Sequence, residues 1–124
     1  MTMTTVEYFA EYRQGLITAI EDYETAREAL RSSRSDVHKY KQEMLKISDE
    51  FEITGPNQAE RDKVFRRKVD YSQPYQGYEK FMTDAAELVA VFEGKVEAQK
   101  YKIRLHELEL KFLIAHTEGT NNND

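Results

Sequence analysis

A heptad pattern of apolar residues organises the first half of the chain. From Phe9 to Phe51 apolar side chains recur at alternating spacings of four and three residues, and no proline interrupts the series. Its members, of which only Ser33 has a side chain that is neither apolar nor aromatic, are Phe9, Tyr12, Leu16, Ala19, Tyr23, Ala26, Leu30, Ser33, Val37, Tyr40, Met44, Ile47 and Phe51. A stripe kept over about six heptads is typical of a long helix whose seam is covered by another helix. We therefore expect a helix near residues 4–53, with Thr4 or Thr5 as its N-cap.

The middle of this helix contains residues of low helix propensity. Residues 32–36 include three serines and an aspartate, whose side chains compete for backbone hydrogen bonds. Val37 resumes the apolar series in register, with no residue inserted or lost. We therefore expect a continuous helix, and the alternative is a kink or break near residues 32–36.

The Thr-Gly-Pro sequence at residues 54–56 ends the first helix, because glycine is common just after a helix and proline cannot continue one. Asn57 followed by Glu60 resembles a capping box, so a second, short helix is expected over residues 58–71. A third helix is expected over residues 75–116, with Pro74 tolerated at its start. Residues 117–124 contain three consecutive asparagines and no apolar side chain, which predicts a disordered tail after a single helical domain.

The third helix has apolar stripes on two faces. Its first stripe comprises Met82, Ala85, Val89, Phe92, Val96, Gln99, Ile103, His106, Leu110 and Leu113. Its second stripe comprises Val91, Gly94, Ala98, Tyr101, Leu105, Leu108, Phe112 and Ala115. A helix with one partner needs only one apolar stripe, so this pattern predicts that the helix is covered on two sides from about Tyr101 onward.

These patterns predict an all-α fold, a long antiparallel helical hairpin like a coiled coil, with a short middle helix. The start of the first helix also has a wide apolar face, because Val6, Ile17 and Ile20 lie beside its seam. An antiparallel hairpin brings this wide region to the same end as the second stripe. We therefore expect that end to pair with another copy in an oligomeric helical bundle. The candidate oligomer interface is formed by Tyr101, Leu105, Leu108 and Phe112.

Charges beside the seam of the first helix are compatible with a second arrangement. In a parallel homodimer Asp22 would face Arg27 of the other chain and Asp36 would face Lys41, and both pairs attract. In an antiparallel hairpin the flanks of the two long helices are partly complementary, but no single register makes every pair attractive. Charge alone does not choose between parallel and antiparallel pairing of the long helices.

Two polar residues and a glycine interrupt the third helix. Gln99 and His106 occupy positions of the first stripe, where polar residues commonly fix the register of helices, and we expect neither to have a chemical role. Gly94 costs about 1 kcal/mol relative to alanine in a helix interior, so it marks either a close helix crossing or a tolerated defect.

Net charge and cysteine content narrow the choice of partners. The 124-residue chain has a net charge of −5 and a pI near 5.3, which argues against wholesale binding to nucleic acid or to an anionic membrane. The chain has no cysteine, which excludes disulfides and thiolate metal sites and is compatible with a reducing cytoplasm. Its first seven residues have neither a basic start nor an apolar run. We expect a cytoplasmic protein with no membrane partner.

The sequence nominates no catalytic or metal site. None of His38, His106 and His116 has a glutamate three residues before it, and no H-E-x-x-H motif occurs. The five glycines are isolated, so no glycine-rich phosphate loop is present. We predict a protein that is not an enzyme and binds neither a metal nor a cofactor.

The densest basic run lies in the second helix, beside Glu60 and Asp62, and comprises Arg61, Lys63, Arg66, Arg67 and Lys68. These residues are the candidate contacts for nucleic-acid phosphates or an acidic partner, with Phe65 available to stack on a base. The other interpretation is an ordinary solvated helix face on an acidic protein.

Taken together, the patterns favour a non-catalytic helical protein-interaction module that forms homo-oligomers and acts as an adaptor, an inhibitor or an assembly factor. A small, acidic, cysteine-free helical chain fits a phage or mobile-element accessory protein. The alternative is a nucleic-acid-binding accessory protein that uses the basic segment 61–68.

Overall fold

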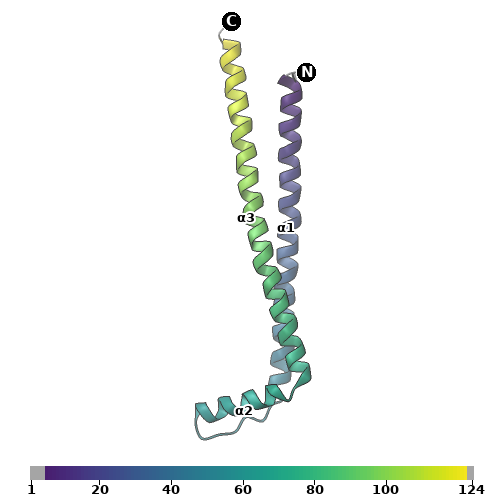
Figure 1. The fold of residues 1–124 in the computed structure, drawn as a ribbon, viewed down its shortest axis with the longest axis vertical. Coiled ribbons are helices and arrows are strands. Elements are labelled where there is room, and N and C mark those ends of the chain that lie inside the picture. Colours follow the sequence, from purple (N-terminus) through teal and green to yellow (C-terminus); the bar gives the residue numbers. More distant parts are fainter. Residues whose placement is uncertain (1–4, 123–124) are drawn as a thin grey trace. The chain divides into compact units, whose positions relative to one another are not determined.

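Three α-helices make up most of the chain. The computed structural model describes the backbone of residues 5–122 and the side chains of residues 6–116. This part of the chain contains α1 (Thr5–Ser48), α2 (Gln58–Asp70) and α3 (Gln73–Asn122), and no strand occurs among residues 5–122 (Figure 1). The prediction of an all-α fold with two long helices and a short middle helix is confirmed.

The first long helix is continuous through residues 32–36, and the expected alternative of a break there is wrong. The side chains of Ser32, Ser35 and Asp36 are exposed, so water satisfies them without disturbing the helix. Ser33, the one polar member of the seam, is buried. Its hydroxyl is small enough to stay on the covered face of the helix.

α1 ends at Ser48 and not near residue 53. Ser48 Oγ donates a hydrogen bond to the carbonyl of Leu45 at 3.1 Å. The N–H of Asp49 still bonds the carbonyl of Leu45, four residues back, at 2.9 Å. The N–H groups of Glu50 and Phe51 instead bond carbonyls three residues back, those of Ile47 at 3.2 Å and Ser48 at 3.0 Å. Bonds of this short range tighten the last turn and close the helix. Phe51 keeps the heptad spacing of the seam but lies after the end of α1, in the turn that follows the helix.

α2 begins at the predicted capping residue. The Asn57 side chain accepts a hydrogen bond from the N–H of Glu60 at 2.9 Å. In the preceding loop Gly55 has a φ of 151°, a conformation that residues with a Cβ rarely adopt. The helix ends at Asp70, next to the expected end at residue 71.

α3 begins at Gln73, slightly before the expected start. Ser72 Oγ accepts a hydrogen bond from the N–H of Tyr75 at 3.3 Å, and Pro74 lies in the first turn as expected. The helix continues to Asn122, so residues 117–122 of the predicted disordered tail are helical. Glycine and asparagine lower helix propensity there, but no proline blocks the helix. Residues 123–124, and the alternative N-cap Thr4, lie outside the described residues.

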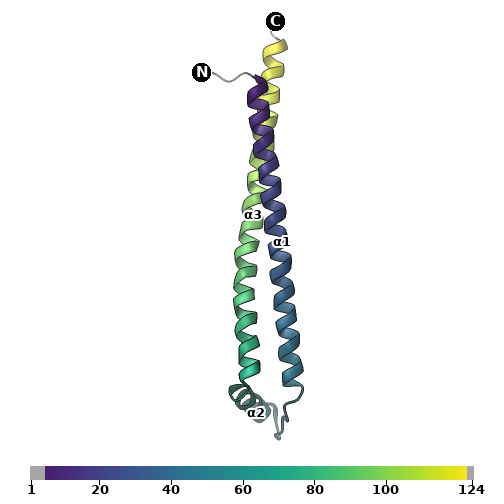
Figure 2. The same ribbon diagram turned by 90° about the vertical axis from the view of Figure 1, so that its right-hand side faces the viewer.

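The chain divides into two compact units, each with a segment of α1 and a segment of α3. Unit 1 comprises Met1–Ala29 and Phe92–Asp124, and unit 2 comprises Leu30–Val91, which includes α2. Within each unit the two segments lie side by side, as Figures 1 and 2 show from two directions.

In unit 1 the α1 and α3 segments are antiparallel. Gly15 lies against the ring of His106, while Ala26, further along α1, lines a cavity together with Phe92, nearer the start of α3. Among the described side chains of this unit, Ala19, Ala26 and Val96 are buried. The core is therefore a thin layer between two helices.

In unit 2 aromatic rings join α1 to the beginning of α3. The ring centroid of Tyr40 lies 6.2 Å from that of Tyr78 and 5.5 Å from that of Phe81. Leu30, Met44 and Ala85 are buried in the same unit. Each ring pair at such a separation stabilises a fold by about 0.5–1.5 kcal/mol, in addition to the contribution from burying its apolar area.

A second aromatic cluster in unit 2 holds α2 in place. The ring of Phe51 lies 5.9 Å from Phe65 and 6.1 Å from Tyr75, and Phe65 and Tyr75 meet edge to face at 6.1 Å. Burial and, to a smaller extent, the nearby carboxylate of Glu79 raise the pKa of the Tyr75 hydroxyl. Tyr75 therefore remains a neutral packing residue at physiological pH.

The burial pattern confirms both predicted seams. Every member of the α1 seam and every member of the first stripe of α3 is buried or half-buried. The α1 seam is therefore covered by α3 of the same chain. Of the two arrangements considered, the antiparallel hairpin and the parallel homodimer, the chain adopts the antiparallel hairpin. No described side chain is completely buried.

Candidate interaction surfaces

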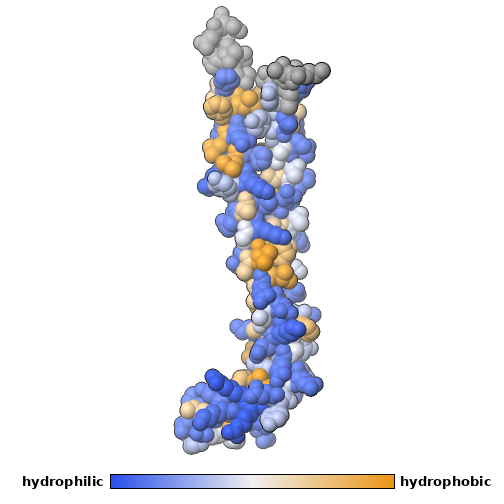
Figure 3. Space-filling view, viewed as in Figure 1, coloured by the Kyte–Doolittle hydropathy of each residue, from blue (hydrophilic) through white to orange (hydrophobic). Residues whose placement is uncertain are grey.

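The second stripe of α3 is uncovered along its whole length. All eight of its members, from Val91 to Ala115, are exposed, whereas all members of the first stripe are covered. In unit 1 the four predicted interface residues, which are 40–74% exposed, are Tyr101, Leu105, Leu108 and Phe112. Figure 3 shows apolar surface along this part of α3. The chain itself supplies no partner for this face within its described residues.

The apolar residues beside the seam of α1 are also exposed in unit 1. Val6, Ile17 and Ile20 all face solvent, as the wide apolar pattern of this segment predicts. Both segments of unit 1 thus present more apolar surface than their mutual contact covers. Large exposed apolar patches on soluble proteins commonly mark interaction sites.

An open groove lies next to the second stripe in unit 1. It has a volume of about 380 Å³ and is lined by Tyr8, Tyr12, Leu108, Glu109, Phe112 and Leu113. A second groove of about 360 Å³ shares Tyr8, Tyr12 and Glu109 with it and extends to His106. The sequence did not predict these grooves, because their walls combine members of both stripes with residues of α1.

The two polar residues of the first stripe lie at the α1–α3 contact of unit 1. A Cβ added to Gly15 would approach His106 Cε1 to 3.0 Å, so this glycine makes room for the imidazole ring. His106 Nδ1 lies 3.9 Å from Glu109 Oε2, outside hydrogen-bond distance. Gln99 Oε1 and His106 Nδ1 are the buried side-chain polar atoms without a hydrogen-bond partner in the described part of the chain.

Gly15 and Gly94, both in unit 1, provide a test of this packing. Gly94 has no atom within 4 Å of an added Cβ, so within the chain it is a tolerated defect and not a close crossing. In the separate chain, we expect Gly94→Ala to raise the free energy of unfolding by about 1 kcal/mol, through helix propensity. Gly15→Ala should gain less or lose stability, because the added methyl group meets His106. Urea unfolding followed by circular dichroism measures both.

The control for this prediction combines Gly15→Ala with His106→Ala. Once the ring is removed, Gly15→Ala should recover the gain of about 1 kcal/mol. If Gly15→Ala in the natural protein stabilises as much as Gly94→Ala, the contact between Gly15 and His106 does not constrain the structure.

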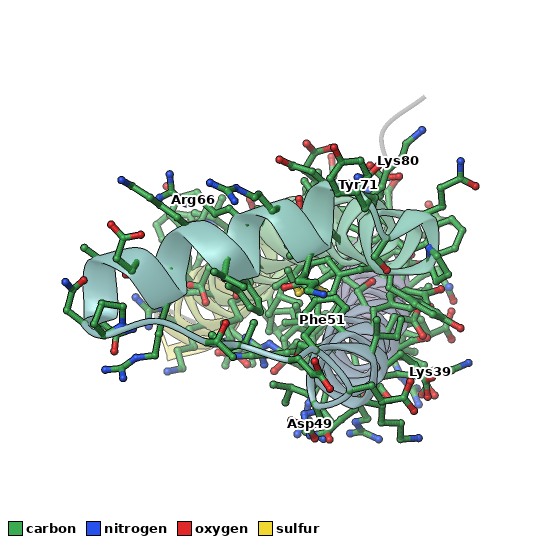
Figure 4. The ribbon with its side chains drawn as sticks, turned by 90° about the horizontal axis from the view of Figure 1, so that it is seen from below. Lys39, Asp49, Phe51, Arg66, Tyr71 and Lys80 are labelled. Atoms are coloured by element: carbon green, nitrogen blue, oxygen red, sulfur yellow. The ribbon has the colours of Figure 1, made fainter. Side chains whose placement is uncertain are left out.

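The basic residues of α2 form an exposed surface in unit 2. All five predicted contact residues are exposed, and Lys63 Nζ lies 3.9 Å from Glu60 Oε1. In Figure 4 Arg66 and Tyr71 lie on the side of α2 away from Phe51, and Lys80 of α3 lies on the same side as Tyr71. Tyr71 is 89% exposed, which the sequence did not predict. In proteins that bind single-stranded nucleic acid, exposed aromatic rings stack on bases and neighbouring basic side chains bind phosphates.

Acidic side chains balance this basic surface. Unit 2 contains eleven lysines and arginines and eleven aspartates and glutamates, so the whole net charge of −5 belongs to unit 1. The acidic residues of α2 itself are Glu60, Asp62 and Asp70. The basic run is therefore a local feature of an electrically neutral unit.

The structure brings together no cluster of metal ligands in its described part. No three histidine, aspartate or glutamate side chains among the described residues are placed to hold a metal ion. None of the helices, over the same residues, is long and apolar enough to cross a membrane. Comparison with known proteins gives no match to this chain among family models, curated proteins or solved structures.

Proposed function

We propose that the chain is a non-catalytic, cytoplasmic helical protein-interaction module that self-associates through the second stripe of α3. The observation that supports this proposal is the uninterrupted exposure of a heptad stripe whose residues include Leu105, Leu108 and Phe112. A heptad stripe on a helix surface is the pattern that a second helix covers. An assembly formed in this way would act as an adaptor, an inhibitor or an assembly factor by presenting its remaining surfaces to another protein.

Sedimentation equilibrium of the natural protein tests the proposal directly. We expect a molar mass that is a multiple of 14.6 kDa at micromolar concentration. Dilution should shift the mass toward the monomer, because such a surface gives a reversible assembly and not a permanent one. A constant mass of 14.6 kDa over the accessible concentration range would contradict self-association.

A nucleic-acid-binding accessory protein is the second candidate. The observation that favours it is the exposure of Arg61, Lys63, Arg66, Arg67 and Lys68 together with Tyr71. Lysine and arginine side chains bind phosphates, and an exposed aromatic ring stacks on bases. Against it stands the balance of acidic and basic residues in unit 2.

An electrophoretic mobility shift separates the two candidates. We expect the natural protein to produce no shift of DNA or RNA at physiological salt, because neighbouring carboxylates repel phosphates. The matched variant reverses the charges of Arg66 and Arg67 to glutamate and should leave helix content unchanged. A shift that weakens with rising salt and disappears in this variant would establish the second candidate instead.

A further inference from the structure

The second stripe of α3 has the spacing of a two-stranded coiled coil within unit 1. From Gly94 to Ala115 its members follow at alternating intervals of four and three residues, over about three heptads. Every one of these members is exposed. In heptad notation Ala98, Leu105 and Phe112 occupy the a positions and Gly94, Tyr101, Leu108 and Ala115 the d positions. The charged residues beside them then define which helix orientation is favoured.

We propose that the surface is occupied by the second stripe of another copy of the chain, with the two α3 helices parallel and in register. This inference rests on the proposed self-association and adds the identity and direction of the partner helix. In this arrangement each stripe residue faces its own counterpart.

Charge complementarity supports the parallel orientation. In a parallel coiled coil a residue that precedes an a position faces the residue five places further along the other helix. Glu97 would then face Lys102 of the second copy, and Arg104 would face its Glu109. The twofold symmetry repeats each pair, which gives four attractive contacts. All four side chains are exposed on unit 1, although Glu97 also accepts a hydrogen bond from Lys100 at 3.2 Å.

The antiparallel orientation gains nothing from the same charges. When Ala98 is placed opposite Ala115 of the second copy, Lys102 faces Glu109, which is attractive. On the other flank Arg104 faces Lys111, which is repulsive. The two contacts cancel in sign, and each occurs twice. Packing does not distinguish the orientations, because either one places large side chains in the middle of the stripe.

Engineered cysteines test the orientation, since the natural chain has none. Ala98→Cys and Ala115→Cys change small, exposed residues near opposite ends of the stripe. In the parallel assembly each variant alone should form a disulfide-linked dimer when oxidised glutathione is added. In the antiparallel assembly neither variant should do so alone, but an equimolar mixture of the two should. Ala10→Cys, at an exposed position of α1 outside the stripe, is the control and should remain unlinked.

These outcomes separate the orientation from the proposed function. Cross-linking of the mixture alone would overturn the parallel orientation and leave self-association through the stripe intact. Oligomers that form no disulfide at either position would place the contact elsewhere and contradict both proposals. A monomeric mass in sedimentation would also contradict both.

Charge reversal gives a second readout of the same geometry. Glu97→Lys places two lysines opposite each other at both symmetric positions and should weaken dimerisation about tenfold. Adding Lys102→Glu restores opposite charges and should restore the affinity. If the double variant associates as weakly as the single one, Glu97 and Lys102 do not face each other and the register is wrong.

Discussion

Replacing Leu105 and Phe112 together by glutamate is expected to convert the assembled protein into monomers of 14.6 kDa. In the proposed assembly the two glutamates of each chain would be buried and unpaired, at a cost of several kcal/mol. In the separate chain both positions face solvent, where glutamate is a good helix former. Sedimentation equilibrium should therefore show dissociation, while circular dichroism shows unchanged helix content.

The size of this effect follows from the apolar residues involved. Full burial of a large apolar side chain contributes roughly 1.5–3 kcal/mol. The four interface residues are 40–74% exposed in the separate chain, so covering them in both copies contributes about half of that per residue, or roughly 7–14 kcal/mol in all. This is comparable with the roughly 8 kcal/mol of a micromolar complex once the cost of association is subtracted. Removing two of the four from each copy is therefore expected to abolish association at micromolar concentration.

A control distinguishes this effect from the mere addition of negative charge. Gln14→Glu with Thr18→Glu adds the same number of carboxylates to exposed positions of α1 in unit 1. This variant should associate as the natural protein does. If the Leu105 and Phe112 variant remains oligomeric, the contact lies on another face. If it loses helix content, these side chains support the fold of the chain itself.

Leu30→Asp is expected to destabilise the protein by about 3–5 kcal/mol, through the burial of an unpaired carboxylate and the loss of an apolar side chain. Leu30 is only 7% exposed and lies in the buried core of unit 2. The total stability of a small domain is only about 5–15 kcal/mol, so this single change removes a large part of it. The midpoint of urea unfolding, followed by circular dichroism, should move to a much lower urea concentration.

Ser32→Asp is the matched control for this variant. Ser32 lies on the same helix and is exposed, so an aspartate there should change the free energy of unfolding by about 0.5 kcal/mol or less. Equal effects of the two variants would mean that position 30 is not covered by α3. That result would contradict the register of the α1 seam.

The sequence was sufficient to predict which faces of the long helices are covered. Both seams follow from helical periodicity, and their burial depends only on the two helices being antiparallel partners. The end of α1 could not be predicted in this way, because Phe51 satisfies the heptad spacing while the backbone N–H groups of Glu50 and Phe51 bond carbonyls only three residues back and close the helix earlier. Local hydrogen bonding, and not apolar spacing, decided that boundary.

The candidate surfaces were predictable only in part. The sequence predicted that the second stripe of α3 is the oligomer interface, and the structure shows that Leu105 and its neighbours are exposed while Ile103 and its neighbours are covered. The contact of Gly15 with His106 depends on the axial register of two helices far apart in the chain. No local pattern specifies that register, since many residues along both seams contribute a little to it.

The small size of several core residues determines which mutations this protein tolerates. Half of the six buried apolar residues among residues 6–116 are alanines, Ala19, Ala26 and Ala85. A position filled by alanine has almost no side chain to lose, so truncation, the usual way to damage a core, has little effect there. Enlargement is harmful instead, because extra methylenes between closely packed helices cost about 1–3 kcal/mol and force the helices apart. Sequence drift at these positions is therefore restricted mainly by an upper limit on volume.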